Sequence, residues 1–188
     1  MYKIATHNSA TGEKPLGLVS YFVIPFARTQ SKTIREQYEV GCRMFDIRVR
    51  FHNNTLYCAH GLFITKRSAW DIINEINTFP EKCYVSITYE GKLSLSDIPT
   101  FKELINHWKR VFNNINWGEI AVKYTDNDIK VDWNVLIPSD RWERAIQGFL
   151  PLDGKTWQTY IPIPWLWKKI YFNKPKFNSD YYICVDFL

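Results

Sequence analysis

The sequence predicts an α/β fold in a single domain that spans residues 1–188. Two observations support this prediction. Strand-like apolar runs alternate with segments of helical periodicity along the first 112 residues. A chain of 188 residues is also long enough to bury a sizeable core. It is short, however, for a complete eightfold α/β barrel, which usually needs about 250 residues.

Composition limits the class of partner. The net charge is +5 and the basic residues are scattered, which favours an anionic partner such as phosphate or lipid headgroups. No nucleic-acid-binding motif is present in the sequence, so we expect no nucleic acid partner. Aromatic residues make up 16% of the chain, more than a core of this size needs. We therefore expect some of them to face a ligand or a membrane interface.

The cysteines and the hydropathy pattern predict where the protein works. The four cysteines lie in apolar runs without a C-x-x-C pair, so they are interpreted as small buried hydrophobes of a reducing compartment. No signal peptide precedes the first strand, and no apolar run reaches about 18 residues. We expect a monomer that is cytoplasmic or peripherally bound to a membrane.

The first strand is predicted at residues 2–5 and leads into a polar loop at residues 6–12. His7 lies near the start of that loop. Catalytic groups of α/β barrels lie at the carboxyl ends of their strands, so His7 is a candidate catalytic residue. A histidine in a loop is nevertheless usually just solvated.

Two segments are candidates for contact with a membrane. Residues 17–26 are apolar on all sides and interrupted by Pro25, so they form either a core segment or an exposed ridge that dips into lipid. Residues 157–177 interleave aromatic side chains with lysines, a composition typical of proteins anchored at a lipid headgroup layer. A strand within an aromatic core is the alternative. Trp165 and Trp167 are the predicted membrane contacts.

A charged strand is predicted at residues 44–51. Apolar and charged side chains alternate with period two, so Asp46 and Arg48 share one face of the strand. A charged strand face is usually solvated. The next strand, at residues 55–60, ends in a titratable ring, His60, which favours a functional site instead.

The two strands are predicted to pair as an antiparallel hairpin, because the Asn53-Asn54 connection is too short for a parallel crossover. A two-residue loop would place Arg48 opposite Ala59. An odd loop or a bulge would set Arg48 opposite His60. A functional site needs the second arrangement, which is the one we expect.

The remaining elements follow from periodicity and capping signals. A helix is predicted over residues 30–41, where Thr33 or Ser31 can cap it, Glu36 follows Thr33 at capping-box spacing, and Gly41 supplies the stop. The other predicted elements are helices at 68–79, 98–112 and 141–149 and strands at 83–88, 120–124, 129–133 and 181–188.

Several motifs of the sequence, and the order in which they follow one another, resemble those of the catalytic X domain of phosphatidylinositol-specific phospholipases C. They cover the first hundred residues or so and the last eight: T-H-N-S at 6–9, Q-S-K-T-I-R-E-Q at 30–37, G-C-R-M-F-D-I-R at 41–48, H-G-L-F at 60–63, V-S-I-T-Y-E at 85–90 and I-C-V-D-F at 183–187. The resemblance implies a distorted, reduced TIM barrel. It also implies an enzyme that cleaves phosphatidylinositol at a membrane surface into diacylglycerol and inositol 1,2-cyclic phosphate.

The resemblance also assigns roles to the candidate residues. It implies that His7 is the general base for the inositol 2-hydroxyl and that His60 is the general acid for the departing diacylglycerol oxygen. Asp46 would position Arg48, the fixed cation at the phosphate. Asp186 would orient His7, as the carboxylate does in a hydrolase triad.

The resemblance predicts no metal and no cofactor. Arg48 falls where calcium-dependent members carry an acidic ligand and metal-free members carry arginine, and Thr88 also replaces a carboxylate ligand. Asn8 departs from the metal-free pattern, which has an aspartate there, so the site is a mixture of the two types. Lys123 and Tyr124, together with Thr88, are candidate contacts to the substrate.

Two other functions remain open. The catalytic motif does not read the headgroup, so the substrate could be another glycerophospholipid. A catalytically weak lipid-binding module is the third hypothesis. The pair of histidines argues against it, because a binding module needs no acid and base.

Overall fold

The computed structural model describes residues 3–125, 146–147 and 182–185, with side chains described for residues 5–118 and 120–122. The strand expected at 129–133 and the aromatic segment 157–177 lie outside the described residues.

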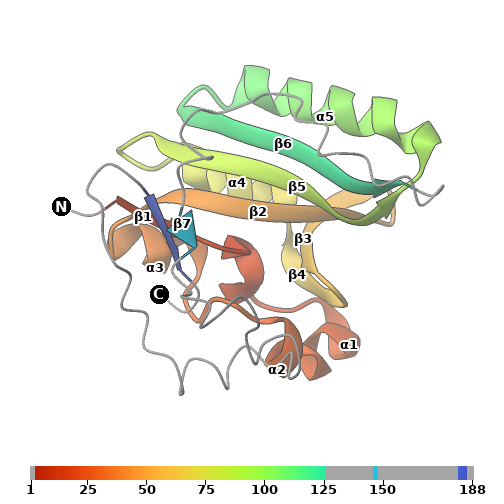
Figure 1. Cartoon of the computed structure of the whole chain (residues 1–188), viewed down its shortest axis with the longest axis horizontal. Helices are drawn as coiled ribbons and strands as arrows, with labels where there is room; N and C mark the ends of the chain where they lie inside the picture. Colours follow the sequence, from red (N-terminus) through yellow and green to blue (C-terminus); the bar gives the residue numbers. More distant parts are fainter. Residues whose placement is uncertain (1–2, 126–145, 148–181, 186–188) are drawn as a thin grey trace.

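Eight strands form one sheet, so the predicted α/β class is confirmed (Figure 1). Six of them run parallel in the order β7-β8-β1-β2-β5-β6. The long strand β2 also pairs antiparallel with β3, and β3 with β4. Within the described part of the chain β6 and β7 do not pair, so the sheet is open there. The strands are β1 (Lys3–Thr6), β2 (Cys42–His52), β3 (Thr55–His60), β4 (Phe63–Ser68), β5 (Cys83–Leu93), β6 (Ile115–Thr125), β7 (Ile146–Gln147) and β8 (Tyr182–Val185).

Helices α3 (Ile34–Glu39), α4 (Ala69–Asn77) and α5 (Ile98–Val111) contribute to a single apolar core with one face of β2, β5 and β6. Figure 1 shows α5 lying along β6. In β2 the core side chains are Phe45, Ile47 and Val49. Because side chains alternate along a strand, Asp46 and Arg48 point to the opposite face, as predicted.

The helix starts follow the predicted capping chemistry. Thr33 accepts a hydrogen bond from the backbone of Glu36 while Glu36 accepts one from the backbone of Thr33, which completes a capping box before α3. Ser68 and Asp71 do the same for α4. Gly41 ends the first of these segments with a positive φ of 102°, a conformation that favours glycine.

The hairpin between β2 and β3 has the tighter of the two predicted loops. Val49 lies opposite Cys58, and Asn53 and Asn54 alone form the turn with φ values of 49° and 60°. Two successive left-handed residues are typical of a type I′ turn, which matches the twist of the flanking strands. The expected odd loop was therefore wrong, and His60 is brought to the site in another way.

Four further predictions need correction. Strand β4 was missed, and β5 runs beyond residue 88. Strand β6 begins at Ile115, before the predicted strand at 120–124. Residues 146 and 147 form β7 in parallel pairing with β8, where a helix over 141–149 was expected. The rest of that predicted helix lies outside the described residues.

Residues 17–26 form two short helices, α1 (Gly17–Phe22) and α2 (Ile24–Ala27), at the periphery of the molecule (Figure 1). Leu18 is 75% exposed and Phe22 is 71% exposed, so the core interpretation of this segment was wrong. We call the exposed apolar side chains of these helices the apolar ridge; they are Leu18, Val19, Tyr21, Phe22 and Phe26. No helix in the described part is long and apolar enough to cross a bilayer.

The described cysteines behave as the sequence predicted. Cys42, Cys58 and Cys83 are buried and free. Burial raises the pKa of Cys42 to about 11 and that of Cys83 to about 12. It also raises the pKa of Cys58. Side chains with such pKa values are neutral thiols at ordinary pH, so they serve as small apolar groups of the core.

Candidate active site

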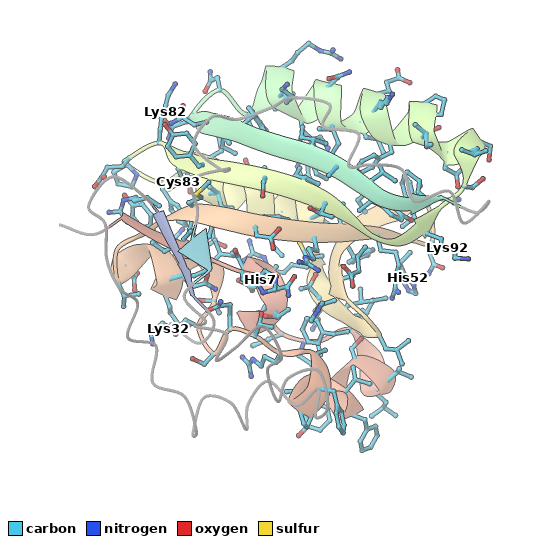
Figure 2. All side chains as sticks on the ribbon, in the orientation of Figure 1. His7, Lys32, His52, Lys82, Cys83 and Lys92 are labelled. Atoms are coloured by element: carbon cyan, nitrogen blue, oxygen red, sulfur yellow. The ribbon has the colours of Figure 1, made fainter. Side chains whose placement is uncertain are left out.

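The candidate site lies at the carboxyl ends of parallel strands. His7 directly follows β1, and Arg48 and Glu90 lie in the second halves of β2 and β5. β1 pairs parallel with β2, and β2 with β5 with Arg48 beside Thr88. Carboxyl ends of parallel strands meet at one edge of a sheet, which is where α/β barrels hold their active sites. Figure 2 labels His7 below β2.

The loop that carries His7 is held by its own side chains. Ser9 Oγ donates to Thr6 O at 2.8 Å, and Thr6 Oγ1 donates to Ser9 Oγ at 2.8 Å. Asn8 has a left-handed φ of 46°, and its backbone N–H donates to Asp46 Oδ2 at 3.1 Å. The buried carboxylate of Asp46 therefore joins the loop after β1 to strand β2.

Residues 27–30 form a second support, which we call the strap. Thr29 Oγ1 and Gln30 Nε2 both donate to the backbone oxygen of His7 at 3.0 Å. The backbone oxygen of Ala27 lies 2.7 Å from Nδ1 of His60. One short segment thus holds His7 by its backbone and His60 by its ring.

Arg48 is the centre of the site. Its Nη2 donates to His7 Nε2 at 2.8 Å, and its Nε and Nη1 face Asp46 Oδ2 at 3.4 Å and Glu90 Oε2 at 3.5 Å. Burial disfavours its charge, but the two carboxylates outweigh that effect and raise the pKa of Arg48. A guanidinium can only donate, so Nε2 of His7 is an acceptor in this arrangement and carries no proton.

His60 reaches the site although the hairpin register does not place it opposite Arg48. The ladder between β2 and β3 ends at the Val49–Cys58 pair, and residues 59 and 60 of β3 pair with β4. The pKa of His60 is lowered, chiefly by burial, with smaller contributions from the positive charge of Arg48 and from His7; Ala27 O and Glu90 act in the opposite direction. Arg48 and His7 therefore both contribute to the electrostatic environment of His60.

The hydrogen bond to Ala27 also fixes the tautomer of His60. A carbonyl oxygen only accepts, so Nδ1 of His60 carries a proton. Nε2 is then the atom that gains or loses a proton when the ring titrates. This is the arrangement that a general acid or base requires, with one nitrogen anchored and the other available.

Glu90 is the residue that the sequence analysis missed. Its Oε1 accepts the backbone N–H of Gly61 at 3.0 Å, and its Oε2 faces Arg48. Arg50 Nη1 donates to the backbone oxygen of the same glycine at 2.9 Å. The signal was present in the sequence, since Glu90 follows Thr88 by two residues and so lies on the same face of β5.

The other predicted residues are distributed as follows. Asn8 is buried, and its amide nitrogen lies 3.4 Å from Nδ1 of His7, next to the proposed base. Thr88 is beside Arg48 in the sheet register. Lys123 and Tyr124 lie in β6 at the backbone level, but their side chains are outside the described set. Asp186, Trp165 and Trp167 lie outside the described residues.

The possible metal ligands in the described part of the chain are dispersed. This part contains no group of three or more His, Cys, Asp or Glu side chains that could hold an ion. The cation that faces Asp46 and Glu90 is the guanidinium of Arg48.

The comparisons with known proteins connect this arrangement to one kind of fold. No family model and no curated protein matches the sequence. A phosphatidylinositol-specific phospholipase C from Listeria monocytogenes is similar in structure, with a TM-score of 0.61 and 16% identity over 99% of this chain and 88% of that chain. A double mutant of the corresponding enzyme from Staphylococcus aureus matches with a TM-score of 0.48 and 18% identity, over 74% of this chain and 54% of that one. The Listeria likeness confirms the expected resemblance at the level of the fold.

Proposed function

We propose that the protein is a phosphatidylinositol-specific phospholipase C that works by acid–base catalysis without a metal. The observation that carries this proposal is the convergence of two histidines on one arginine. Arg48 contacts Nε2 of His7 at 2.8 Å, and it faces Glu90 at 3.5 Å, whose other oxygen accepts the backbone N–H of Gly61 directly after His60. In-line displacement at a phosphodiester needs a base, an acid on the other side and a fixed cation.

His7 is the proposed base. Its Nε2 would take the proton of the inositol 2-hydroxyl as that oxygen attacks phosphorus and closes the cyclic phosphate. In the ligand-free arrangement Nε2 accepts a hydrogen bond from Arg48. The guanidinium must therefore turn towards the substrate phosphate when it binds, which both frees the base and places a planar cation on the developing negative charge.

His60 is the proposed acid. Protonated at Nε2, it would give that proton to the glycerol oxygen as the phosphorus–oxygen bond breaks, so that one proton is taken up by His7 and one is released by His60. Burial lowers the pKa of His60 and so disfavours the protonated ring. A bound phosphodiester anion would favour the protonated ring, because opposite charges attract at short range.

Arg48 supports the proposal that no calcium is needed. Its side chain lies between the carboxylates of Asp46 and Glu90 at 3.4 and 3.5 Å. Calcium binds through oxygen ligands at 2.3–2.6 Å, and a guanidinium between the same carboxylates supplies a competing positive charge. The cation at the phosphate would therefore be a side chain.

The remaining predicted residues complete the proposal. Asp186 would orient His7. The headgroup would be contacted by Thr88, Lys123 and Tyr124. The parallel strands would close into a distorted, reduced barrel. Thr88 has the best support, because its neighbour in the sheet is Arg48.

The apolar ridge is the proposed membrane-docking surface. It is next to the site, because α2 ends at Ala27, whose oxygen contacts His60. Leu62, which is 63% exposed, directly follows the His60-Gly61 pair and extends the apolar surface on the other side. Lys14 and Lys66 are exposed and joined by a backbone hydrogen bond beside α1, which suits anionic lipid.

Phosphorus NMR of the products tests this function. Wild-type protein with vesicles of phosphatidylinositol should give a cyclic phosphodiester signal at the same rate with and without excess chelator. If phosphate products are released from another glycerophospholipid but not from phosphatidylinositol, the protein is a phosphodiesterase for that other lipid. Vesicle binding with no turnover of any phospholipid would support a lipid-binding module instead.

A further inference from the structure

Glu90 touches both halves of the candidate site, and no role follows for it from the fold or from the expected acid–base pair. One carboxylate oxygen faces Arg48 at 3.5 Å and the other accepts the N–H of Gly61 at 3.0 Å. Arg48 in turn contacts His7, while Gly61 directly follows His60. Glu90 thus links the two histidines, through Arg48 on the side of His7 and through Gly61 on the side of His60.

We propose that Glu90 is a positioning residue that fixes Arg48 and the turn after His60 relative to one another. The proposal rests on the proposed function, since it names the residue that aligns the base side with the acid side. Glu90 would not contact the reacting atoms itself.

The turn after His60 needs such a partner. His60 and Phe63 close a two-residue β-turn between β3 and β4, with Gly61 at a φ of 59°. Gly61 and Leu62 are exposed, so packing does not hold this turn. Gly61 is instead held from two sides, with its N–H donating to Glu90 and its backbone oxygen accepting from Arg50. A hydrogen bond from a backbone N–H to a charged carboxylate is among the stronger hydrogen bonds, so Glu90 restrains the backbone that carries the acid.

The charge of Glu90 has a second consequence at the same place. The titratable and charged groups that act on His60 come from three elements: Glu90 from β5, Arg48 from β2 and His7 from the loop after β1. Of these, Glu90 alone favours the protonated ring. Glu90 therefore favours both the position and the charge state that an acid needs.

Two substitutions separate these effects. Glu90→Gln keeps an oxygen for the Gly61 N–H and the shape of the side chain but removes the charge, whereas Glu90→Ala removes both. Glu81→Gln is the matched control, because Glu81 is paired with Arg43 at 3.1 Å on the surface, away from the site. The titration of the His60 ring is followed by NMR in the absence of substrate. Turnover of a soluble inositol phosphodiester is followed against pH.

We expect Glu90→Gln to move the His60 titration to lower pH. The falling limb of kcat/KM at high pH should move in the same direction, because the acid then loses its proton earlier. Glu90→Ala should in addition lower kcat by about tenfold to a hundredfold at every pH, the effect of a misplaced catalytic group. Glu81→Gln should change neither readout.

Three outcomes would overturn the assignment. These are an unchanged His60 titration in Glu90→Gln, an unchanged kcat in Glu90→Ala, or an equal loss at all pH values in Glu90→Gln without a shift of the limb. The titration needs no turnover, so it remains informative if the wild type cleaves no phosphatidylinositol. If the wild type is active and the Glu90 variants match it in titration and turnover, the positioning role of Glu90 is refuted and the proposed function is unaffected.

Discussion

The guanidinium of Arg48 lies 2.8 Å from Nε2 of His7, so the proposed base and the proposed phosphate cation are hydrogen-bonded to one another. Neither group is left exposed without a partner in the site. A substrate that separates them must offer Arg48 an anion and His7 a hydroxyl at the same time, which is what an inositol phosphodiester offers. We therefore expect ligands that carry only one of these groups to bind more weakly than an inositol phosphodiester.

The first prediction concerns the two histidines. His7→Ala and His60→Ala should each lower turnover of phosphatidylinositol by about two to four orders of magnitude, the usual contribution of one acid or base. His107→Ala is the control, since His107 stacks on Trp70 at 5.8 Å on the helix side of the sheet. Near wild-type turnover in either site variant would remove that histidine from the mechanism.

The second prediction concerns Arg48. Arg48→Lys keeps the charge but loses the fork that contacts His7, Asp46 and Glu90, so kcat should fall by about a hundredfold or more, as on removal of one fixed donor. Arg43→Lys, at the surface pair with Glu81, should have little effect. Turnover by the wild type should survive excess chelator. A saturable requirement for calcium in that assay would refute the metal-independent mechanism.

The third prediction is a pH dependence of stability. The pKa of His60 lies below its ordinary value of 6.5 because the ring is buried, so the unfolded chain binds the proton more tightly than the folded protein. The free energy of unfolding should therefore fall as the pH falls through 6.5, until the folded ring is itself protonated. His60→Asn should lose this part of the pH dependence, measured by urea unfolding at several pH values. Identical slopes for the two proteins in this range would contradict the burial effect.

The fourth prediction concerns the apolar ridge. A double substitution, Leu18→Ser with Phe22→Ser, should weaken binding to vesicles of phosphatidylinositol and phosphatidylcholine by at least about tenfold, because each buried apolar side chain contributes about 1.5–3 kcal/mol. Activity on a short, soluble substrate should be unchanged. Val111→Ser, at a 44% exposed position on α5, is the control. Equal vesicle binding by the double variant and the wild type would exclude this surface.

The fifth prediction concerns Trp165 and Trp167, which lie outside the described residues. If the segment 157–177 also docks on lipid, Trp165→Ala or Trp167→Ala should weaken vesicle binding and activity on vesicles while sparing the soluble substrate. Equal loss on both substrates would assign these tryptophans to the core.

Local rules in the sequence predicted much of the fold. The capping box at Thr33 and the period-two alternation around Asp46 depend only on near neighbours, and the structure confirms them. Strand β4 was missed because it has no clear alternation, and its existence depends on pairing with β3. The exposure of residues 17–26 could not be decided either, because a segment that is apolar on all sides has no polar face to show which side meets solvent.

The site was predictable as a set of residues but not as an arrangement. The motifs brought forward His7, Arg48 and His60, and in the structure Arg48 contacts His7 directly and is linked to the residue after His60 through Glu90. The strap contacts made by Ala27 and Thr29 could not be foreseen, because Ala27 acts through its backbone oxygen, which no side-chain pattern reveals. The predicted hairpin register was wrong because Asn53 and Asn54 form a two-residue turn without a bulge, and His60 pairs with β4 instead of β2.

The turn at Asn53 and Asn54 has a consequence for how this chain can change over time. Side chains of a strand alternate in direction, so adding or removing one residue in the turn would reverse the facing of every following residue of β3. Asn→Gly or Asn→Asp exchanges keep the left-handed conformation and should be tolerated. The turn can therefore change in composition but not in length. Insertions that preserve the site would have to fall elsewhere on the surface.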